Sequence, residues 1–404
     1  MLLNDSILGQ RFSNLALVLV LLFPIFINSV KIFSSLILLF LVVLGCYIAI
    51  SDKLNPFKIK ELKLLSWLTV GYFVVMLLSI VIADGIHAEF HHLGRKLQFL
   101  LAPFIALAIY KINIPLKSLL LSIKIGLVII GAIVIIQSLL GYDRPSGMMN
   151  QNIFGDIAVA MLFLSIVRVF EEEPKERVIT FSSIVFGLFA IVLSGNRGSW
   201  ISALILGVFY FGIIYKRYLF NNTKLKLITF GLLAIILTSI INTQTFNRQI
   251  LNTETAIERW LDGNIKQSSV GERLNMWISG LKAFRESPLI GYGYRNANKA
   301  AQKYTSKDIA GYTHLHNEYL TNLVSAGIIG LLSLLALIFL PMLVFYRKLK
   351  DKASYYYALM GMMLCIGYAT FGFSHIAFGE EHINAFYVLF ISFLLPKAIR
   401  IDST

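Results

Sequence analysis

The sequence predicts an all-α integral membrane protein with about 12 transmembrane helices. Hydrophobic residues make up 57% of the chain and charged residues only 14%, whereas soluble domains carry about 25% charged residues. The mean hydropathy is +0.74. Apolar runs recur along the chain, and about 20 consecutive apolar residues are enough for a helix to cross roughly 30 Å of hydrocarbon. Together these observations favour a bundle of helices in lipid over a soluble fold.

The expected spans are apolar segments separated by short polar connections. They lie at 14–29, 32–50, 64–83, 97–110, 118–140, 153–169, 178–194, 199–215, 226–241, 322–346, 355–373 and 384–396. Only one Arg precedes the first run and no small-residue cleavage site follows Ile27. We therefore expect the first run to be an uncleaved helix and not a signal peptide.

The basic residues predict the orientation. If both termini face the cytoplasm, the inner segments hold 20 Lys and Arg residues and the short outer loops hold 5. This asymmetry obeys the positive-inside rule. It places a large loop, 242–321, in the periplasm between helices 9 and 10. The predicted organisation is therefore 1–241 with helices 1–9, the 242–321 loop with short helices, and 322–404 with helices 10–12 and a cytoplasmic tail.

The net charge of +14 does not predict a nucleic-acid partner. Although a basic chain often binds nucleic acid, the positive charge here lies in short loops between apolar runs, where it contacts membrane lipids. Cys46 and Cys365 both lie inside apolar segments. They predict neither a disulfide framework nor a metal cluster.

The periplasmic loop contains one clear helical pattern, over 272–285. The expected apolar face of this helix consists of Leu274, Trp277, Ile278 and Leu281. Pro288 and the glycines that follow it end the pattern.

Arg197 is the most informative single residue. It lies in a short outer connection between two apolar helices. One interpretation is that its side chain snorkels to the lipid headgroups. The flanking Gly195 and Gly198 instead indicate close backbone approach to another segment. Arg also suits paired hydrogen bonds to phosphate oxygens, which makes Arg197 a candidate anion-binding residue.

The loop adds further candidates. Arg273 precedes Trp277 by four residues, so the two share a helix face, although an ordinary surface Arg would fit as well. His314 and His316 flank Leu315, but no nearby Cys or Asp completes a metal site, and alternate residues of a helix do not share a face. We therefore predict no metal. An unperturbed His titrates near 6.5, and neighbouring Arg charges favour the neutral form, so His316 suits a general base.

Two further outer loops carry titratable residues. The first is either a binding patch for an anionic headgroup or phosphorylated acceptor, or an interfacial segment; it holds His87, His91, His92, Arg95 and Lys96. The last outer loop is expected to be solvated and has no predicted role; it holds His375, Glu380, Glu381 and His382.

Five short motifs follow one another around the large loop. They are SGNRGSW (194–200), GERLNMW (271–277), SPLIGYG (287–293), HLHNEYL (314–320) and SAGIIGL (325–331). In their order and spacing the chain resembles the O-antigen ligase/polymerase superfamily, and within it the bacterial O-antigen ligases. The specific part of the resemblance runs from Arg144 to Leu331.

The resemblance implies a GT-C-like enzyme of the bacterial inner membrane whose active site faces the periplasm. Such ligases transfer a glycan from undecaprenyl pyrophosphate to a hydroxyl of lipid A–core. They invert the anomeric centre and use neither metal nor ATP, so no cofactor is expected. The family's phosphate-binding arginines match Arg197 and Arg273, and its essential histidine, which is followed directly by Asn, matches His316.

The supporting residues are expected to bind donor or acceptor. They are Arg144, Asn152, Trp277, His314 and Asn317.

Three alternatives stay open. The first is the polymerase of the same superfamily, and the second is a related protein O-glycosyltransferase. Those transferases usually carry an added C-terminal soluble region, whereas this chain stops soon after the twelfth expected span. The third is a transporter or flippase, although such proteins often show repeats and midplane ionisable residues. We see no repeat, and Lys124, the main ionisable residue inside a span, is expected to snorkel.

Overall fold

The computed structural model describes residues 7–85, 91–215, 269–294, 296–305 and 314–400, with Tyr312 and isolated positions between 217 and 258. This part of the chain folds entirely as helices and connections. Nine of its helices are long and apolar enough to cross a membrane. The predicted class, an all-helical multi-pass membrane protein, is confirmed.

The helices follow the expected spans closely. They are α2 (Ile7–Phe26), α3 (Lys31–Ser51), α4 (Lys60–Asp84), η2 (His91–Lys96), α5 (Leu97–Lys111), α6 (Leu116–Leu139), α7 (Gln151–Ser165), η3 (Val169–Glu171), α8 (Pro174–Leu193), α9 (Arg197–Ile214), α12 (Ser269–Glu286), α13 (Ala297–Gln302), α14 (Glu318–Lys348), α15 (Tyr355–Phe371) and α16 (Glu381–Arg400). Each expected span coincides with one of them except 226–241. That span lies outside the described residues apart from its two ends, so the predicted boundary at 241 stays a prediction.

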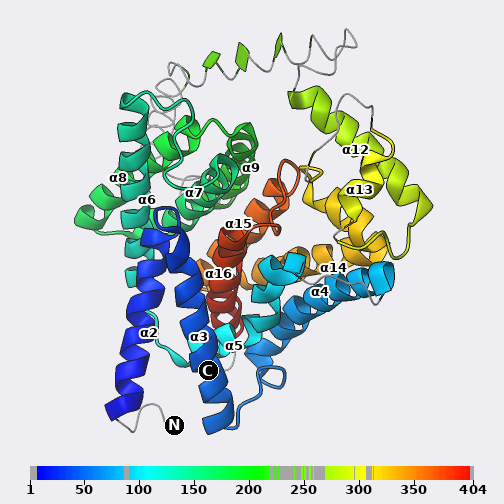
Figure 1. Cartoon of the computed structure of the whole chain (residues 1–404). Helices are drawn as coiled ribbons and strands as arrows, with labels where there is room; N and C mark the ends of the chain where they lie inside the picture. The colour runs from blue at the N-terminus through cyan, green and yellow to red at the C-terminus, as the bar shows by residue number, and fades with distance from the viewer. Residues whose placement is uncertain are drawn as a thin grey trace.

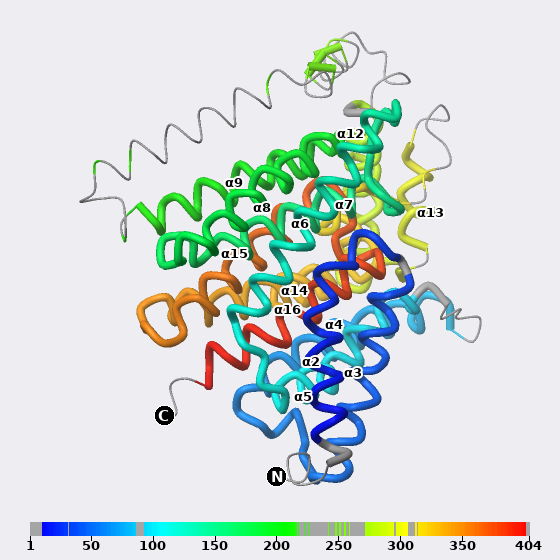
Figure 2. The backbone as a smooth tube through the Cα atoms, turned by 90° about the vertical axis from the view of Figure 1, so that its left-hand side faces the viewer, coloured from blue at the N-terminus to red at the C-terminus, as the bar shows by residue number. Residues whose placement is uncertain are grey.

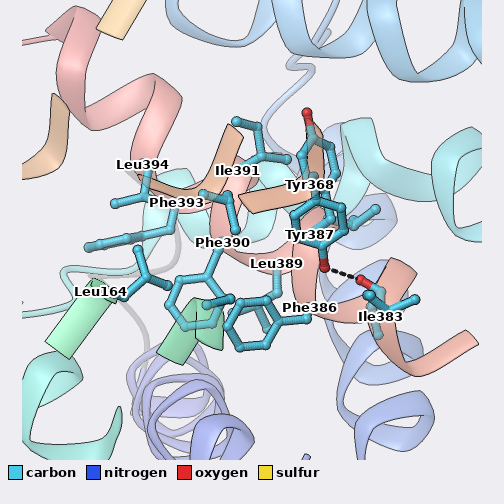
Figure 3. Close-up of a cluster of buried hydrophobic side chains, with 14 of the residues drawn as sticks. Leu164, Tyr368, Ile383, Phe386, Tyr387, Leu389, Phe390, Ile391, Phe393 and Leu394 are labelled. Carbon is cyan, nitrogen blue, oxygen red and sulfur yellow. Dashed lines mark hydrogen bonds between the residues drawn. The ribbon is translucent and has the colours of Figure 1, made fainter. Parts of the chain in front are cut away.

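The bundle is organised around its last helix (Figures 1 and 2). Most residues of α16 are buried, and so are most residues of α7. Aromatic side chains of α15 and α16 pack together there, including Tyr368, Phe386, Tyr387 and Phe390 (Figure 3). The Tyr368 hydroxyl donates to the backbone carbonyl of Ile383, as expected where no water is available to a buried hydroxyl. The α15–α16 connection is therefore attached to a closely packed centre.

Lys124 was expected to snorkel to the headgroups, but it does not. Its side chain is buried in α6, and its Nζ lies 2.5 Å from Glu172. The carboxylate of Glu172 also accepts a hydrogen bond from Thr180. A buried charge is tolerated when it is paired and hydrogen-bonded, so this lysine has a partner inside the protein and needs no path to the headgroups.

Helix α14 is broken near its N-terminal end, at Ala326 and Gly327. Gly327 has φ +63°, a conformation that favours glycine, and a Cβ there would overlap the loop backbone at Leu289. The backbone N–H groups of Tyr292 and Gly293 donate to the carbonyls of Val324 and Ser325, at 2.9 and 2.8 Å. The break thus leaves helix carbonyls without helical partners, and the loop N–H groups donate to them instead. These hydrogen bonds attach the loop to α14.

The helix expected over 272–285 is present as α12, and its expected apolar face is only partly buried. Ile278 is 51% exposed and Leu281 48%. The buried positions are mostly small: Met276, Ser279, Gly280 and Ala283. A Cβ on Gly280 would lie only 2.9 Å from the Leu320 side chain of α14. Close packing against α14 therefore selects the face with small residues over the more hydrophobic one.

Candidate functional site

Four separate segments meet at one end of the bundle. They are the start of α9, helix α12, the residues before α14 and the α15–α16 connection (Figure 1). A Cβ on Gly198 would overlap the hydroxyl of Ser374. The Trp277 indole N–H donates to the carbonyl of Leu315 at 2.9 Å. The close approach that Gly198 predicted is therefore real, and its partner is the α15–α16 connection.

Arg197 is the first residue of α9 and is held by a capping network. The Asn196 side chain accepts the Gly198 N–H at 3.1 Å, as an N-cap does. The same side chain donates to the carbonyl of Asn152 at 3.2 Å. This links the predicted Asn152 to the Arg197 segment through its backbone. The cap therefore fixes the position from which the Arg197 side chain extends.

A buried carboxyl group lies beneath this cap. Asp156 of α7 is fully buried and accepts a hydrogen bond from the Ser199 hydroxyl at 2.6 Å. The Asn196 side chain donates to it at 3.4 Å. Sequence reasoning missed Asp156 because it lies inside an apolar run. The signal was available, since an ionisable residue within a span is costly and usually functional.

Arg144 lies beside the Arg197 segment. Its Nε donates to the carbonyl of Ser194 at 3.3 Å and its Nη2 to that of Gly195 at 3.0 Å. These carbonyls end α8 and would otherwise lack partners. The observed bonds of Arg144 are therefore to the protein backbone, and its predicted contact with substrate would use the remaining donors.

Three arginines from three segments act on one another electrostatically. Burial lowers the pKa of Arg273, and the charges of Arg197 and Arg144 lower it further. Burial also lowers the pKa of Arg144, followed by the charge of Arg197. Within the described residues, neither Arg144 nor Arg273 forms an ion pair with a carboxylate. Such a group of like charges is stabilised by an anion that accepts several charge-assisted hydrogen bonds.

His314 and His316 lie side by side, with ring centroids 4.0 Å apart. The expectation that alternate residues do not share a face fails here because the segment is not helical. His316 has φ +50°, a strained conformation for a residue other than glycine, of a kind that clusters at functional sites. Burial, then His314 and then Arg273 lower the pKa of His316 to about 4. His316 is thus neutral at neutral pH, in the direction expected.

His375 is a third imidazole at this place. It belongs to the α15–α16 connection, is 5% exposed, and its ring centroid lies 6.3 Å from that of His314. Burial, then His314, His316 and Arg273 lower its pKa to about 3. No spacing in the sequence relates His375 to His316, although the apolar residues after it indicate burial. The prediction of no metal relied on the lack of a third ligand, and His375 supplies one.

Trp277 and Asn317 hold the histidine segment. The Trp277 indole binds its backbone, and the Asn317 side chain accepts the Leu320 N–H at 2.9 Å as the N-cap of α14. Both were predicted to bind substrate. Their observed hydrogen bonds are to the protein backbone. These bonds indicate that Trp277 and Asn317 position the histidine segment.

Lys96 is not part of an exposed anion-binding patch, one of the two interpretations left open. It is completely buried, donates to the Tyr72 hydroxyl at 2.6 Å and lies 4.0 Å from Glu318. Its neighbour Arg95 pairs with Glu380 at 3.3 Å. The side chains of the three histidines of that loop lie outside what the structure describes.

The fold and this site define a multi-pass membrane protein with arginines and histidines gathered at one end of its bundle. A model described as O-antigen ligase matches residues 182–335, a stretch that includes Arg197, Arg273 and His316. The chain belongs to the O-antigen ligase family and is a glycan-transferring enzyme of that superfamily.

Two relatives are informative. An uncharacterized protein of Haemophilus influenzae is 30% identical over 295 residues, which are 69% of this chain and 71% of that protein. The ComP-specific O-oligosaccharyltransferase of Acinetobacter baylyi is 26% identical over 209 residues, which are 50% of this chain. The match covers 36% of that longer protein.

Proposed function

We propose that this protein is an inverting, metal-independent O-antigen ligase of the bacterial inner membrane. It transfers O-antigen polysaccharide from undecaprenyl pyrophosphate to a sugar hydroxyl of lipid A–core at the periplasmic face. The observation that carries this proposal is the convergence of Arg144, Arg197 and Arg273 next to neutral His316. A pyrophosphate group matches the arginines, and an acceptor hydroxyl matches the histidine.

The chemistry needs little more than these groups. The acceptor oxygen attacks the anomeric carbon from the face opposite the leaving group, so one C–O bond forms as the bond to pyrophosphate breaks. The imidazole of His316 takes the hydroxyl proton. Arg197 and Arg273 bind the negative charge that grows on the released lipid pyrophosphate, in charge-assisted hydrogen bonds worth about 1.5–3 kcal/mol each. A single displacement of this kind inverts the anomeric centre.

The donor itself strengthens the base. In the free protein the charge of Arg273 contributes to the low pKa of His316. When a pyrophosphate neutralises that charge, this contribution falls and the pKa of His316 rises. The base is therefore weak until the donor is bound, which limits wasteful deprotonation of water or of other hydroxyls.

The test is reconstitution. Purified protein in detergent is incubated with undecaprenyl-pyrophosphate glycan and lipid A–core, with chelator present and no nucleotide, and the products are separated on a gel beside His316→Ala. We expect a high-mass glycolipid that requires lipid A–core and is lost in the variant. Chain growth on the donor alone would indicate the polymerase. No product with either acceptor would contradict both activities.

A protein acceptor is the second candidate, because the relative from Acinetobacter baylyi is named for O-oligosaccharide transfer to ComP. The arginines and His316 would act in the same way on a serine or threonine hydroxyl. The same assay with a membrane-anchored acceptor protein in place of lipid A–core separates the two. Glycan on the protein and none on the lipid would favour this candidate.

A further inference from the structure

Three histidines from two distant segments form one cluster at the candidate site. His314 and His316 precede α14, and His375 lies on the α15–α16 connection. The side-chain nitrogens that could act as ligands all lie within 4.8 Å of one another. We call this cluster of His314, His316 and His375 the histidine triad.

Ring nitrogens of the triad lack hydrogen-bond partners among the described residues. They are Nδ1 of His316 and both nitrogens of His375. His375 is only 5% exposed, and a buried polar group without a partner costs about 1–3 kcal/mol. By contrast, the hydroxyls of Tyr368 and Tyr387, buried in the same bundle, each donate to a backbone carbonyl. One ring nitrogen of a neutral histidine carries an N–H and the other a lone pair, so the unpartnered lone pair of His375 points to a ligand that accepts it.

We propose that the histidine triad binds one divalent transition-metal ion of the Zn²⁺ class. Imidazole nitrogens suit Zn²⁺, Ni²⁺ and Cu²⁺, whereas Mg²⁺ and Ca²⁺ require oxygen ligands that the triad does not supply. Three imidazoles and one open position form the ligand set of an accessible zinc site, with Zn–N distances of about 2.0–2.1 Å. The nitrogens must then move to about 3.4 Å from one another, which is a small shift for residues on two connections.

The surroundings of the histidine triad weaken its binding of a metal ion. The positive charge of Arg273 acts on all three imidazoles and opposes a cation. The unsatisfied nitrogens also show that no carboxylate or carbonyl of the described residues orients the His375 ring, as partners do in tight sites. The bound ion is therefore held less firmly than in a structural zinc site.

Binding of the ion has a consequence that depends on the proposed function. A metal coordinated by His316 occupies the lone pair that would accept the acceptor's proton. Metal binding and acceptor activation then exclude one another, and Zn²⁺ inhibits glycan transfer. The triad is in this sense a site at which metal ions regulate the enzyme without taking part in the reaction.

The experiment measures metal binding directly and needs no glycan substrate. Chelator-treated full-length protein in detergent is titrated with Co²⁺, and the visible d–d absorption is followed before and after addition of Zn²⁺. We expect one Co²⁺ per chain, displaced by Zn²⁺, which binds more tightly. His375→Ala and His314→Ala each remove a ligand and should weaken binding by at least the ~100-fold that loss of an outer-shell partner can cost. His382→Ala, a histidine outside the triad, should bind as the wild type does.

Two variants on different segments guard against a folding defect, which size-exclusion elution and thermal unfolding would reveal. No Co²⁺ spectrum in the wild type, or unchanged affinity in both triad variants, would overturn the proposal. The failure of the proposed function is distinguishable: metal binding without glycan transfer to any acceptor removes the ligase and keeps the site. Glycan transfer that Zn²⁺ does not inhibit removes the regulatory role.

Discussion

Glu318 accepts the backbone N–H of Phe378 on its Oε2 at 2.9 Å. Its own backbone N–H donates to the carbonyl of Gly372 at 2.8 Å. One residue, two positions after His316, thus holds both ends of the connection that carries His375. A change in the Glu318 side chain should therefore loosen the connection that carries His375 at Phe378.

Replacing Glu318 with Gln should destabilise the protein. The amide leaves buried Lys96 without its counter-charge, and breaking a buried ion pair typically costs about 3–5 kcal/mol. We expect a lower midpoint of thermal unfolding, measured in detergent, and partial recovery in Lys96→Met/Glu318→Gln, which removes both charges. Glu381→Gln, an exposed position, serves as the control. Equal midpoints for wild type and Glu318→Gln would show that the pair contributes nothing.

His316→Ala should reduce glycan transfer by about 10²–10⁴-fold, the usual contribution of a general base. His314→Ala should have a milder effect because His314 is a neighbour of the base. The rates are measured in the reconstituted assay at equal amounts of folded protein. If the two variants lose activity equally, His316 has no separate role as the base.

Arg197→Lys and Arg273→Lys should each impair transfer although the charge is kept. Lys cannot make the paired hydrogen bonds by which Arg binds phosphate oxygens. The loss of one charge-assisted bond, about 1.5–3 kcal/mol, corresponds to roughly 10- to 150-fold in kcat/KM. Arg285→Lys, in the last turn of α12, is the matched control. Wild-type kinetics in Arg197→Lys and Arg273→Lys would contradict phosphate binding by these residues.

The pH dependence follows from the low pKa of His316. The base must be unprotonated, so activity is lost as the pH falls through its pKa. In the free enzyme that pKa is about 4, because burial, His314 and Arg273 lower it. The acid limb of kcat/KM should therefore lie well below the ordinary histidine value of about 6.5. The acid limb of kcat should lie higher, since bound donor compensates Arg273. If the acid limbs of kcat and kcat/KM fall at the same pH, near the ordinary histidine pKa, in folded protein, this account is contradicted.

Gly198→Ala should impair activity through a steric clash. The added Cβ would overlap the hydroxyl of Ser374, and so displace the connection that carries His375. Ser374→Gly removes the clashing atoms, and the double variant should recover activity. Gly212→Ala, where a Cβ meets nothing within 4 Å, is the control in the same helix. A double variant as impaired as Gly198→Ala would exclude the steric origin of the defect.

The spans could be placed from the sequence because a run of about 20 apolar residues rarely occurs outside a membrane helix. Arg197 and His316 could also be chosen, since each lies in a polar motif at the end of a span. The place of His375 could not be predicted, because it depends on how α15 and α16 pack and on no local spacing. The burial of Lys96 could not be predicted either, because Lys is almost always exposed and its partner Glu318 is far along the chain.

The sequence pattern did not show which face α12 buries, for another reason. A hydrophobic pattern favours large apolar side chains such as Ile278, whereas close packing of two helices needs small ones such as Gly280. Periodicity identifies the helix, and only the shape of the neighbouring surface decides how it is rotated.

The break in α14 also constrains the order in which the molecule assembles. As a continuous helix, this segment would satisfy its own backbone and could enter the membrane unaided. The broken form leaves the carbonyls of Val324 and Ser325 to the N–H groups of Tyr292 and Gly293. It therefore exists only once the loop has docked. Docking of the 287–293 segment and formation of the bend at Gly327 are therefore one event.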